Sequence, residues 1–160
     1  MYTFLEIFVG ILLTEWTFIF GARRIFGRYI NEWYSHFGAF AILSDVSSIF
    51  IGIMIAMYLY TGSLAGLIAV AVGVQWVHDL LFYNVILSIP KGTNEIIDLL
   101  KPYGADAGIA AVIGDSWMMV GSLLGAHAVS MLPLKGQMFS MFVSLYILPY
   151  AVYQKPSLAH

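Results

Sequence analysis

The stretch VGVQWVHDLLFYN, residues 72–84, places the adjacent ionisable residues His78 and Asp79 inside a long apolar segment. That segment runs from about residue 63 to residue 89, and about 20 apolar residues are enough for a helix to cross a bilayer. Ionisable side chains are rare in such helices, where they face the bundle interior or a water-filled cavity and mark functional sites by default. The stretch therefore predicts a membrane-spanning helix that carries a polar site.

The composition of the whole chain also predicts a lipid environment. Of its 160 residues, 61% are hydrophobic and 10% are charged, with a mean hydropathy of +0.87. Soluble domains carry about 25% charged residues, so too few polar side chains remain here to cover a water-facing surface. The net charge of -2 gives no basic field for nucleic acid, and the absence of cysteine excludes thiolate metal sites. We expect one domain that needs no cofactor, with the bilayer as its surroundings.

Five segments are long and apolar enough to span a membrane: residues 2–22, 37–61, 63–89, 106–132 and 137–154. Two stretches between them, residues 23–36 and 90–105, suit the membrane interface. In the second stretch a short surface helix is expected, ended by Pro102 and Gly104. The predicted fold is an all-α integral membrane bundle of about five transmembrane helices with two short interfacial segments.

The basic residues orient this five-span chain, because Lys and Arg gather on the cytoplasmic side of membrane proteins. One side carries six of them: Arg23, Arg24, Arg28, Lys91, Lys101 and Lys155. Only Lys135 falls on the other side. The N-terminus is therefore expected outside and the C-terminus in the cytoplasm. Aromatic residues would form the interface belts, Tyr29, Trp33, Tyr34, Tyr103, Tyr150 and Tyr153 on the inner side and Tyr58 and Tyr60 on the outer.

Four predicted spans each place one acid at a depth of seven to ten residues from the cytoplasmic end: Glu15, Asp45, Asp79 and Asp115. At a rise of 1.5 Å per residue, all four lie roughly 10–15 Å from that membrane edge. This shared depth predicts that the acids, together with His78, form one ion- or proton-binding layer. Four side chains at suitable helical spacing would support them by hydrogen bonding: Gln75, Ser48, Ser116 and Tyr83.

Small residues on the same helices predict close helix packing. Gly38 and Gly52 share a stripe with Asp45, and Gly121 and Gly125 form a GxxxG pattern. Such faces let helices approach closely, so the polar stripes are expected to point into the bundle. Because 160 residues make a small bundle for a transporter, we also expect a homo-oligomer joined through small-residue faces.

An ionised carboxylate in mid-bilayer costs several kcal/mol, from about 3 upward. No Lys or Arg lies within a predicted span to neutralise the four acids. They must therefore be protonated, share protons, pair with protonated His78 or hold a cation. The alternative is that they act only as hydrogen-bonding glue between helices, worth roughly 0.6–2 kcal/mol each.

Three functions fit this pattern. The first is conduction or transport of protons or small cations through the acid layer, with His78 as gate or relay because its ordinary pKa lies near neutrality. The second is a structural or interaction role in a membrane, in which the acids only fix helix register. The third, a membrane-embedded enzyme acting on lipid, has the least support, because no glycine-flanked nucleophile and no Glu-x-x-His metal motif is present. Catalytic residues are not predicted, and the metal content stays open.

Four segments carry a resemblance to known proteins: LSDVSSIFIGIMIA, VGVQWVHDLLFYNVILSIPKG, NEIIDLLKPY and IGDSWMMVGSLL. Over roughly residues 37–150, the chain resembles small multi-pass membrane proteins encoded by large nucleocytoplasmic DNA viruses. The pattern of that group maps onto Asp45, His78, Asp79, Pro90, Gly92 and Asp115. The group has no established activity, so the resemblance implies no mechanism. It implies a viral origin, in a host-cell membrane or in the lipid layer beneath a capsid, with a capsid or host membrane protein as partner.

Overall fold

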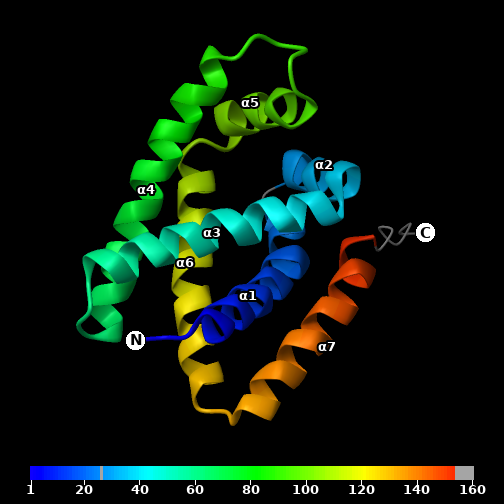
Figure 1. Cartoon of the computed structure of the whole chain (residues 1–160). Helices are drawn as coiled ribbons and strands as arrows, with labels where there is room; N and C mark the ends of the chain where they lie inside the picture. Colours follow the sequence, from blue (N-terminus) through cyan, green and yellow to red (C-terminus); the bar gives the residue numbers. More distant parts are fainter. Residues whose placement is uncertain (26, 154–160) are drawn as a thin grey trace.

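The structure is a computed structural model that describes residues 1–25 and 27–153. In this part of the chain there are seven α-helices and no strands (Figure 1). The helices are α1 (Phe4–Ile25), α2 (Gly27–Phe37), α3 (Ala39–Leu59), α4 (Leu64–Ser88), α5 (Glu95–Ala107), α6 (Ile109–Ser130) and α7 (Leu134–Val152). The expected all-α class is confirmed. Lys155 lies outside the described residues, as do the side chains of Arg23, Arg24, Arg28 and Tyr29.

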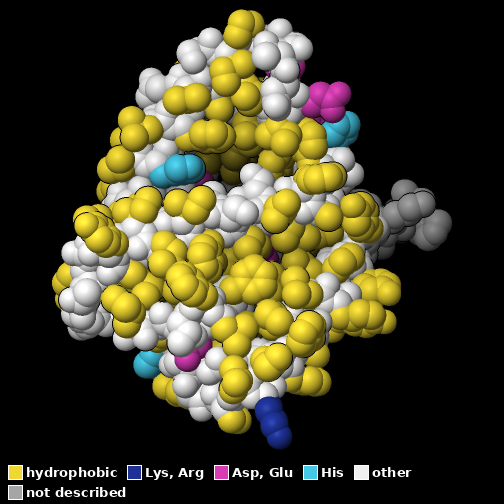
Figure 2. Space-filling view, in the orientation of Figure 1, with side chains coloured by type: hydrophobic (Ala, Val, Ile, Leu, Met, Phe, Trp, Pro, Cys, Tyr) yellow, Lys and Arg dark blue, Asp and Glu magenta, His cyan; other side chains and the backbone are white. Residues whose placement is uncertain are grey.

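Four of these helices, α1, α3, α4 and α6, are long and apolar enough to cross a membrane. Hydrophobic side chains cover much of the visible surface, as a lipid environment requires (Figure 2). The fifth expected span corresponds to α7, a 19-residue helix that packs along α1. It is not among the four, because Lys135 and Gln137 in its first turn lower its mean hydropathy. The structure therefore supports a membrane helical bundle and leaves the count of five spans as a prediction.

The two expected interfacial stretches form the short helices α2 and α5, which contact each other at one end of the bundle (Figure 1). The predicted end of the second one was wrong. Helix α5 passes through Pro102 and Gly104 and continues to Ala107. Proline removes only one backbone donor. The side chains of Leu99, three residues before Pro102, and of Tyr103, directly after it, pack against the core. Asn94 caps the helix start by accepting from two backbone N–H groups.

Two glycines turn the chain from a short helix into a long one. Gly38 joins α2 to α3 with φ 53° and ψ -119°, and Gly108 joins α5 to α6 with φ 47° and ψ -121°. Side chains rarely tolerate this backbone region, so glycine is the residue suited to both turns. Seven residues, about two helical turns, separate each glycine from an aspartate, Asp45 in α3 and Asp115 in α6.

Most of the chain consists of two halves, each containing one of these turns and the same order of helices. The first half is α1–α2–α3 and the second half is α4–α5–α6; each is a long helix, a short helix, a glycine and a second long helix. The halves pack reciprocally, since α1 lies against α6 and α3 lies against α4. The long helices thus bring their acids into the same region from opposite sides.

The closest helix contact joins α1 to α6. A Cβ at Gly10 would overlap the Ser122 carbonyl oxygen, and a Cβ at Gly125 would lie 3.0 Å from the Gly10 Cα. A Cβ at Gly121 would likewise lie 2.8 Å from Thr14 Cγ2. The GxxxG pattern is therefore used within the chain, so these glycines do not form the free oligomer face expected from the sequence.

The other two predicted packing glycines differ from each other. Gly52 is buried, and a Cβ there would collide with the end of the Met119 side chain on α6. Gly38 lies at the turn before α3 rather than on a packed helix face, and the space beside it is filled by the Tyr153 ring. Its requirement for glycine comes from the positive φ and from this ring together.

Candidate functional site

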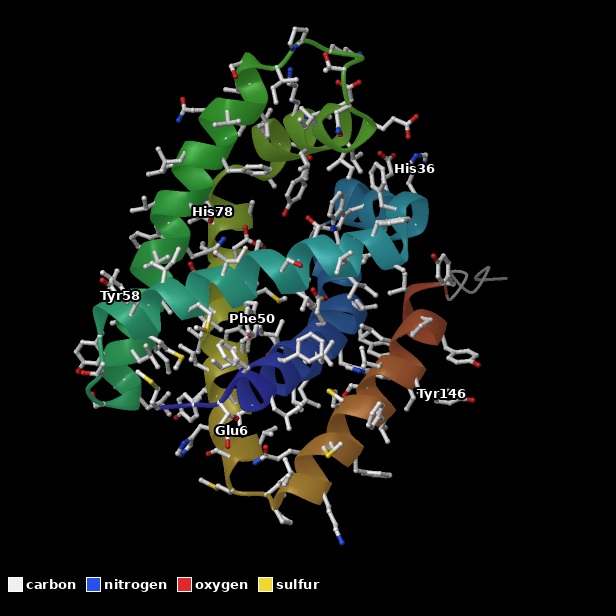
Figure 3. The ribbon with its side chains drawn as sticks, in the orientation of Figure 1. Glu6, His36, Phe50, Tyr58, His78 and Tyr146 are labelled. Carbon is white, nitrogen blue, oxygen red and sulfur yellow. The ribbon has the colours of Figure 1, made fainter. Side chains whose placement is uncertain are left out.

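A cavity of about 460 Å³ lies between α3, α4, α5 and α6, with further walls from α1 and α2. Figure 2 shows its opening as a hollow in the surface, and Figure 3 shows His78 on α4 beside that hollow. Most of the polar residues singled out from the sequence line it: Asp45, Ser48, Gln75, His78, Asp79, Tyr83 and Asp115. The structure thus brings acids from three different helices around one space.

The polar face of α4 forms one wall. Gln75 Nε2 donates to Asp79 Oδ1 at 2.6 Å, and His78 Nδ1 lies 3.2 Å from the same oxygen. The His78 ring stacks on Phe82, with centroids 5.5 Å apart and an interplanar angle of 12°, and about half of its side chain is exposed. Asp79 Oδ2 is buried and has no hydrogen-bond partner among the described residues. His78 is therefore the titratable group nearest the outside, and Asp79 lies behind it.

Asp45 forms the opposite wall and receives two donors from α2. Trp33 Nε1 donates to Asp45 Oδ2 at 3.0 Å, and the Tyr34 hydroxyl lies 3.1 Å from the same oxygen. The Tyr34 hydroxyl is also 3.2 Å from Glu15 Oε2 on α1. Glu15 itself is 0% exposed, and its other oxygen has no partner in the described part of the chain. Tyr34 thus bridges two carboxyl groups that come from different long helices.

The number of hydrogens at this bridge limits its protonation states. A tyrosine hydroxyl has one hydrogen and can donate it to only one carboxyl group. The second contact becomes a hydrogen bond only when the other carboxyl is protonated and donates to the tyrosine oxygen. Both contacts of Tyr34 are therefore hydrogen bonds when one of the two acids carries a proton and the other is ionised. The two acids then share one proton through Tyr34.

Both tyrosines of the short helices that face the acids are held in the neutral form. Burial, followed by the charges of Asp45 and Glu15, raises the pKa of Tyr34 well above its ordinary value of 10.0. Burial, followed by the charges of Asp115, Asp45 and Asp79, likewise raises the pKa of Tyr103. Neutral hydroxyls beside carboxyl groups can donate or relay a proton without adding charge to the site.

Asp115 differs from the other acids of the cavity because its carboxyl group has no hydrogen-bond partner among the residues described. Ser116, the neighbouring supporting residue predicted from the sequence, does not line the cavity. Its hydroxyl accepts from Trp76 Nε1 at 2.8 Å and donates to the Val112 carbonyl at 2.7 Å, on the outer side of the α4–α6 contact. Ser116 therefore joins two helices, while Asp115 faces the cavity.

The sequence reasoning missed three residues of this site. Trp33, Tyr34 and Tyr103 were assigned to an interface belt, whereas Tyr34 is buried, Trp33 bonds Asp45 and both Trp33 and Tyr103 line the cavity. One signal could have found them: acids without donors in their own spans need donors from flanking segments. Trp33 and Tyr103 also stand at the same distance, five residues, before Gly38 and Gly108.

The geometry suits protons better than a coordinated metal ion. The described residues contain no group of three or more His, Asp or Glu placed to hold a metal. No Lys or Arg is among the described residues that line the cavity. Lys101, the basic residue of α5, donates instead to the Ile89 carbonyl at the end of α4. Comparison of the chain with protein-family models, curated proteins and solved structures gives no match.

Proposed function

We propose that the protein binds protons at its buried acids and moves them across a membrane. The observation that carries this proposal is the Glu15–Tyr34–Asp45 bridge, in which one hydroxyl lies within 3.2 Å of both carboxyl groups. A concerted shift of two hydrogens along this bridge moves the proton from one acid to the other without moving a charge through lipid. Such a chain is a proton relay, and hydrogen-bond glue does not require a second acid.

The proposed path enters the cavity on the α5 side, which Tyr103 and Gly104 line, and reaches His78 on α4 (Figure 3). From there Asp79, Asp115 and Asp45 face the same cavity, and water within it would connect them. Tyr34 passes the proton from Asp45 to Glu15. Beyond Glu15 the path would follow the α1–α6 contact, where the Ser122 hydroxyl is buried without a partner among the described residues.

At the far end of that contact, the Tyr2 hydroxyl and His127 Nδ1 lie 3.0 Å apart, close to the turn before α7. Glu6 accepts there from the Thr3 backbone and from Gln137 Nε2, which joins α1 to α7. These polar groups would form the exit. We place this end outside and the α2–α5 end in the cytoplasm, by the distribution of basic residues. Helix α7 is then the fifth span, and the resemblance to viral proteins suggests a host-cell or virion inner membrane.

The test is proton flux into liposomes that contain the purified protein and a trapped pH dye. A potassium gradient with valinomycin supplies the driving potential. Wild-type vesicles should acidify faster than protein-free vesicles, and Tyr34→Phe and Glu15→Gln should reduce the flux to the protein-free level. Asp106→Asn, which changes an exposed acid of α5 outside the cavity, is the matched control and should conduct like the wild type.

Wild-type flux equal to that of protein-free vesicles would reject the transport proposal and favour the structural role. Flux that survives in Tyr34→Phe but not in Asp45→Asn would reject the relay through Tyr34 and support proton transport that depends on the acids alone. Each protein must elute as a single species in detergent before its flux is compared.

A further inference from the structure

The walls of the cavity suit a ligand much larger than a proton. Its volume of about 460 Å³ falls in the roughly 300–1,000 Å³ range of pockets that enclose small organic molecules. Five aromatic side chains line it, from four different helices: Phe18, Trp33, Phe82, Tyr83 and Tyr103. Aliphatic residues such as Ile49 and Leu99 fill the spaces between them.

Among the described lining residues, the acids outnumber the one group that can become positive, His78. Asp45, Asp79 and Asp115 reach the cavity from three helices, and the described lining residues include no Lys or Arg. Asp79 Oδ2 is buried without a partner, and the Asp115 carboxyl also has none among the described residues. A buried carboxylate without a partner is costly, so each of these acids either takes up a proton or pairs with a positive charge, which a bound cation can supply.

We propose that this cavity binds a hydrophobic organic cation, such as an aromatic phosphonium or a bulky quaternary ammonium ion. Aromatic faces attract such cations, most strongly where water is excluded, and the carboxylates of Asp79 and Asp115 neutralise them. The inference rests on the proposed function in one respect: the cation and the transported protons use the same acids, so the cation is the second cargo of that site.

The place of the opening agrees with this ligand class. His78 and Leu80, both exposed, line the cavity on the α4 side, and Ser44, also exposed, lines it on the α3 side. The hollow of Figure 2 thus opens on the flank of the bundle, between two helices suited to a membrane. A hydrophobic cation that has entered the lipid leaflet can reach the acids from there without passing through a dry helix interface.

Other occupants fit less well. A hydrophobic anion would meet three acids, and a neutral lipid would leave their charges unpaired. A bare metal ion would lack three ligating groups among the described residues. The cavity therefore selects for positive charge and for aromatic surface together.

The experiment measures binding of tetraphenylphosphonium to the purified protein in detergent, by equilibrium dialysis against protein-free micelles. Tetraphenylborate, which has nearly the same shape and the opposite charge, is the ligand control. Wild-type protein should retain the phosphonium above the micelle level, and tetraphenylborate, dialysed separately, should not be retained above that level. Phosphonium retention equal to that of micelles, or equal binding of both ions, would overturn the proposal.

Two sets of variants locate the site. Asp79→Asn together with Asp115→Asn should weaken binding by roughly tenfold or more, because a buried charge loses its partner. Asp106→Asn should leave binding unchanged. Tyr103→Leu should weaken binding while Tyr103→Phe retains it, because the aromatic face and not the hydroxyl contacts the cation. Unchanged binding in the Asp double variant would place the phosphonium elsewhere and reject the site.

A second measurement keeps the test decisive if the double variant does not fold. A hydrophobic carbodiimide labels buried carboxyl groups of the wild-type protein, and mass spectrometry identifies the labelled peptides. Phosphonium should protect Asp79 and Asp115 but not Asp106; equal labelling with and without phosphonium would overturn the inference. Proton flux without phosphonium binding would reject the cation site alone, and binding without flux would reject the transport proposal alone.

Discussion

The two halves of the molecule have the same order of helices but differ in how their acids are hydrogen-bonded. In the first half, Tyr34 stands four residues before Gly38 and bridges Glu15 to Asp45. In the second half, the residue four positions before Gly108 is Gly104, which has no side chain to place between Asp79 and Asp115. The first pair of acids is therefore joined by a hydrogen-bonded bridge, and the second pair faces the cavity.

The space near Gly104 is used by another residue. The Tyr83 ring of α4 lies so close that a Cβ at Gly104 would be 2.7 Å from its Cε2 atom. Tyr83 forms part of the cavity wall instead of bridging the acids. The comparison shows how one scaffold can hold both a pair of acids bridged by a tyrosine and a pair of acids without such a bridge.

The largest expected difference between the halves comes from removing a hydroxyl group. Tyr34→Phe should abolish proton flux and lower stability by about 1–3 kcal/mol, because buried Glu15 and Asp45 lose their shared partner. Tyr103→Phe, the matched change on α5, should leave stability within about 0.5 kcal/mol because its hydroxyl makes no hydrogen bond to a described residue. Unfolding of both variants in a mixed-detergent titration measures this. Equal losses would show that the two halves do not differ in this way.

The two glycine turns should differ in a second comparison. Gly38→Ala and Gly108→Ala each force a side chain into a sparsely populated backbone region, at about 1–3 kcal/mol. Gly38→Ala should be the more destabilising, because its Cβ would also displace the Tyr153 ring, whereas nothing lies within 4 Å of a Cβ at Gly108. Thermal unfolding in the same detergent ranks the two. A larger loss at Gly108 would contradict this account of the first turn.

A smaller effect is expected from making the second half resemble the first. Gly104→Ala should push the Tyr83 ring into the cavity and weaken tetraphenylphosphonium binding, with little change in stability because the ring can move. Gly73→Ala, at an exposed α4 position with nothing within 4 Å of the added Cβ, is the control and should bind like the wild type. Equilibrium dialysis gives the comparison. Equal binding by the Gly104→Ala protein would show that Tyr83 does not limit the cavity.

The smallest expected effect tests the difference between a site residue and a helix contact. Ser116→Ala removes the bond from Trp76 and should lower stability by roughly 0.6 kcal/mol, the average for such interhelical bonds. Proton flux and phosphonium binding should stay unchanged because Ser116 does not line the cavity. A loss of flux without a loss of stability would show that Ser116 belongs to the functional site.

Residue spacing predicted the parts of the site that lie on one helix. Gln75, His78, Asp79 and Tyr83 share a face of α4 because a helix repeats every 3.6 residues, and all four line the cavity. The ends of the long apolar helices were predicted to within three residues from apolar length, whereas the end of α5 and the turn at Gly38 were not. Ser116 shows the limit of this reasoning, because its neighbour Asp115 faces the cavity while Ser116 faces Trp76.

Contacts between helices could not be read from the sequence in the same way. Tyr34 meets Glu15 only because α2 folds back over α1, and nothing in the spacing of 19 residues specifies that direction. An interfacial position and an inward-facing position also favour the same residue types, so Trp33 and Tyr103 fitted a membrane belt equally well. Their true partners depend on the packing of whole helices.

The contact between α1 and α6 has a consequence for how the chain is made. Helix α1 is synthesised before the other described helices, but its closest partner contains Gly125, which lies 115 residues after Gly10. Until α6 has been made, α1 and its Glu15 lack this neighbour. The final packing of α1 therefore has to follow the synthesis of α6.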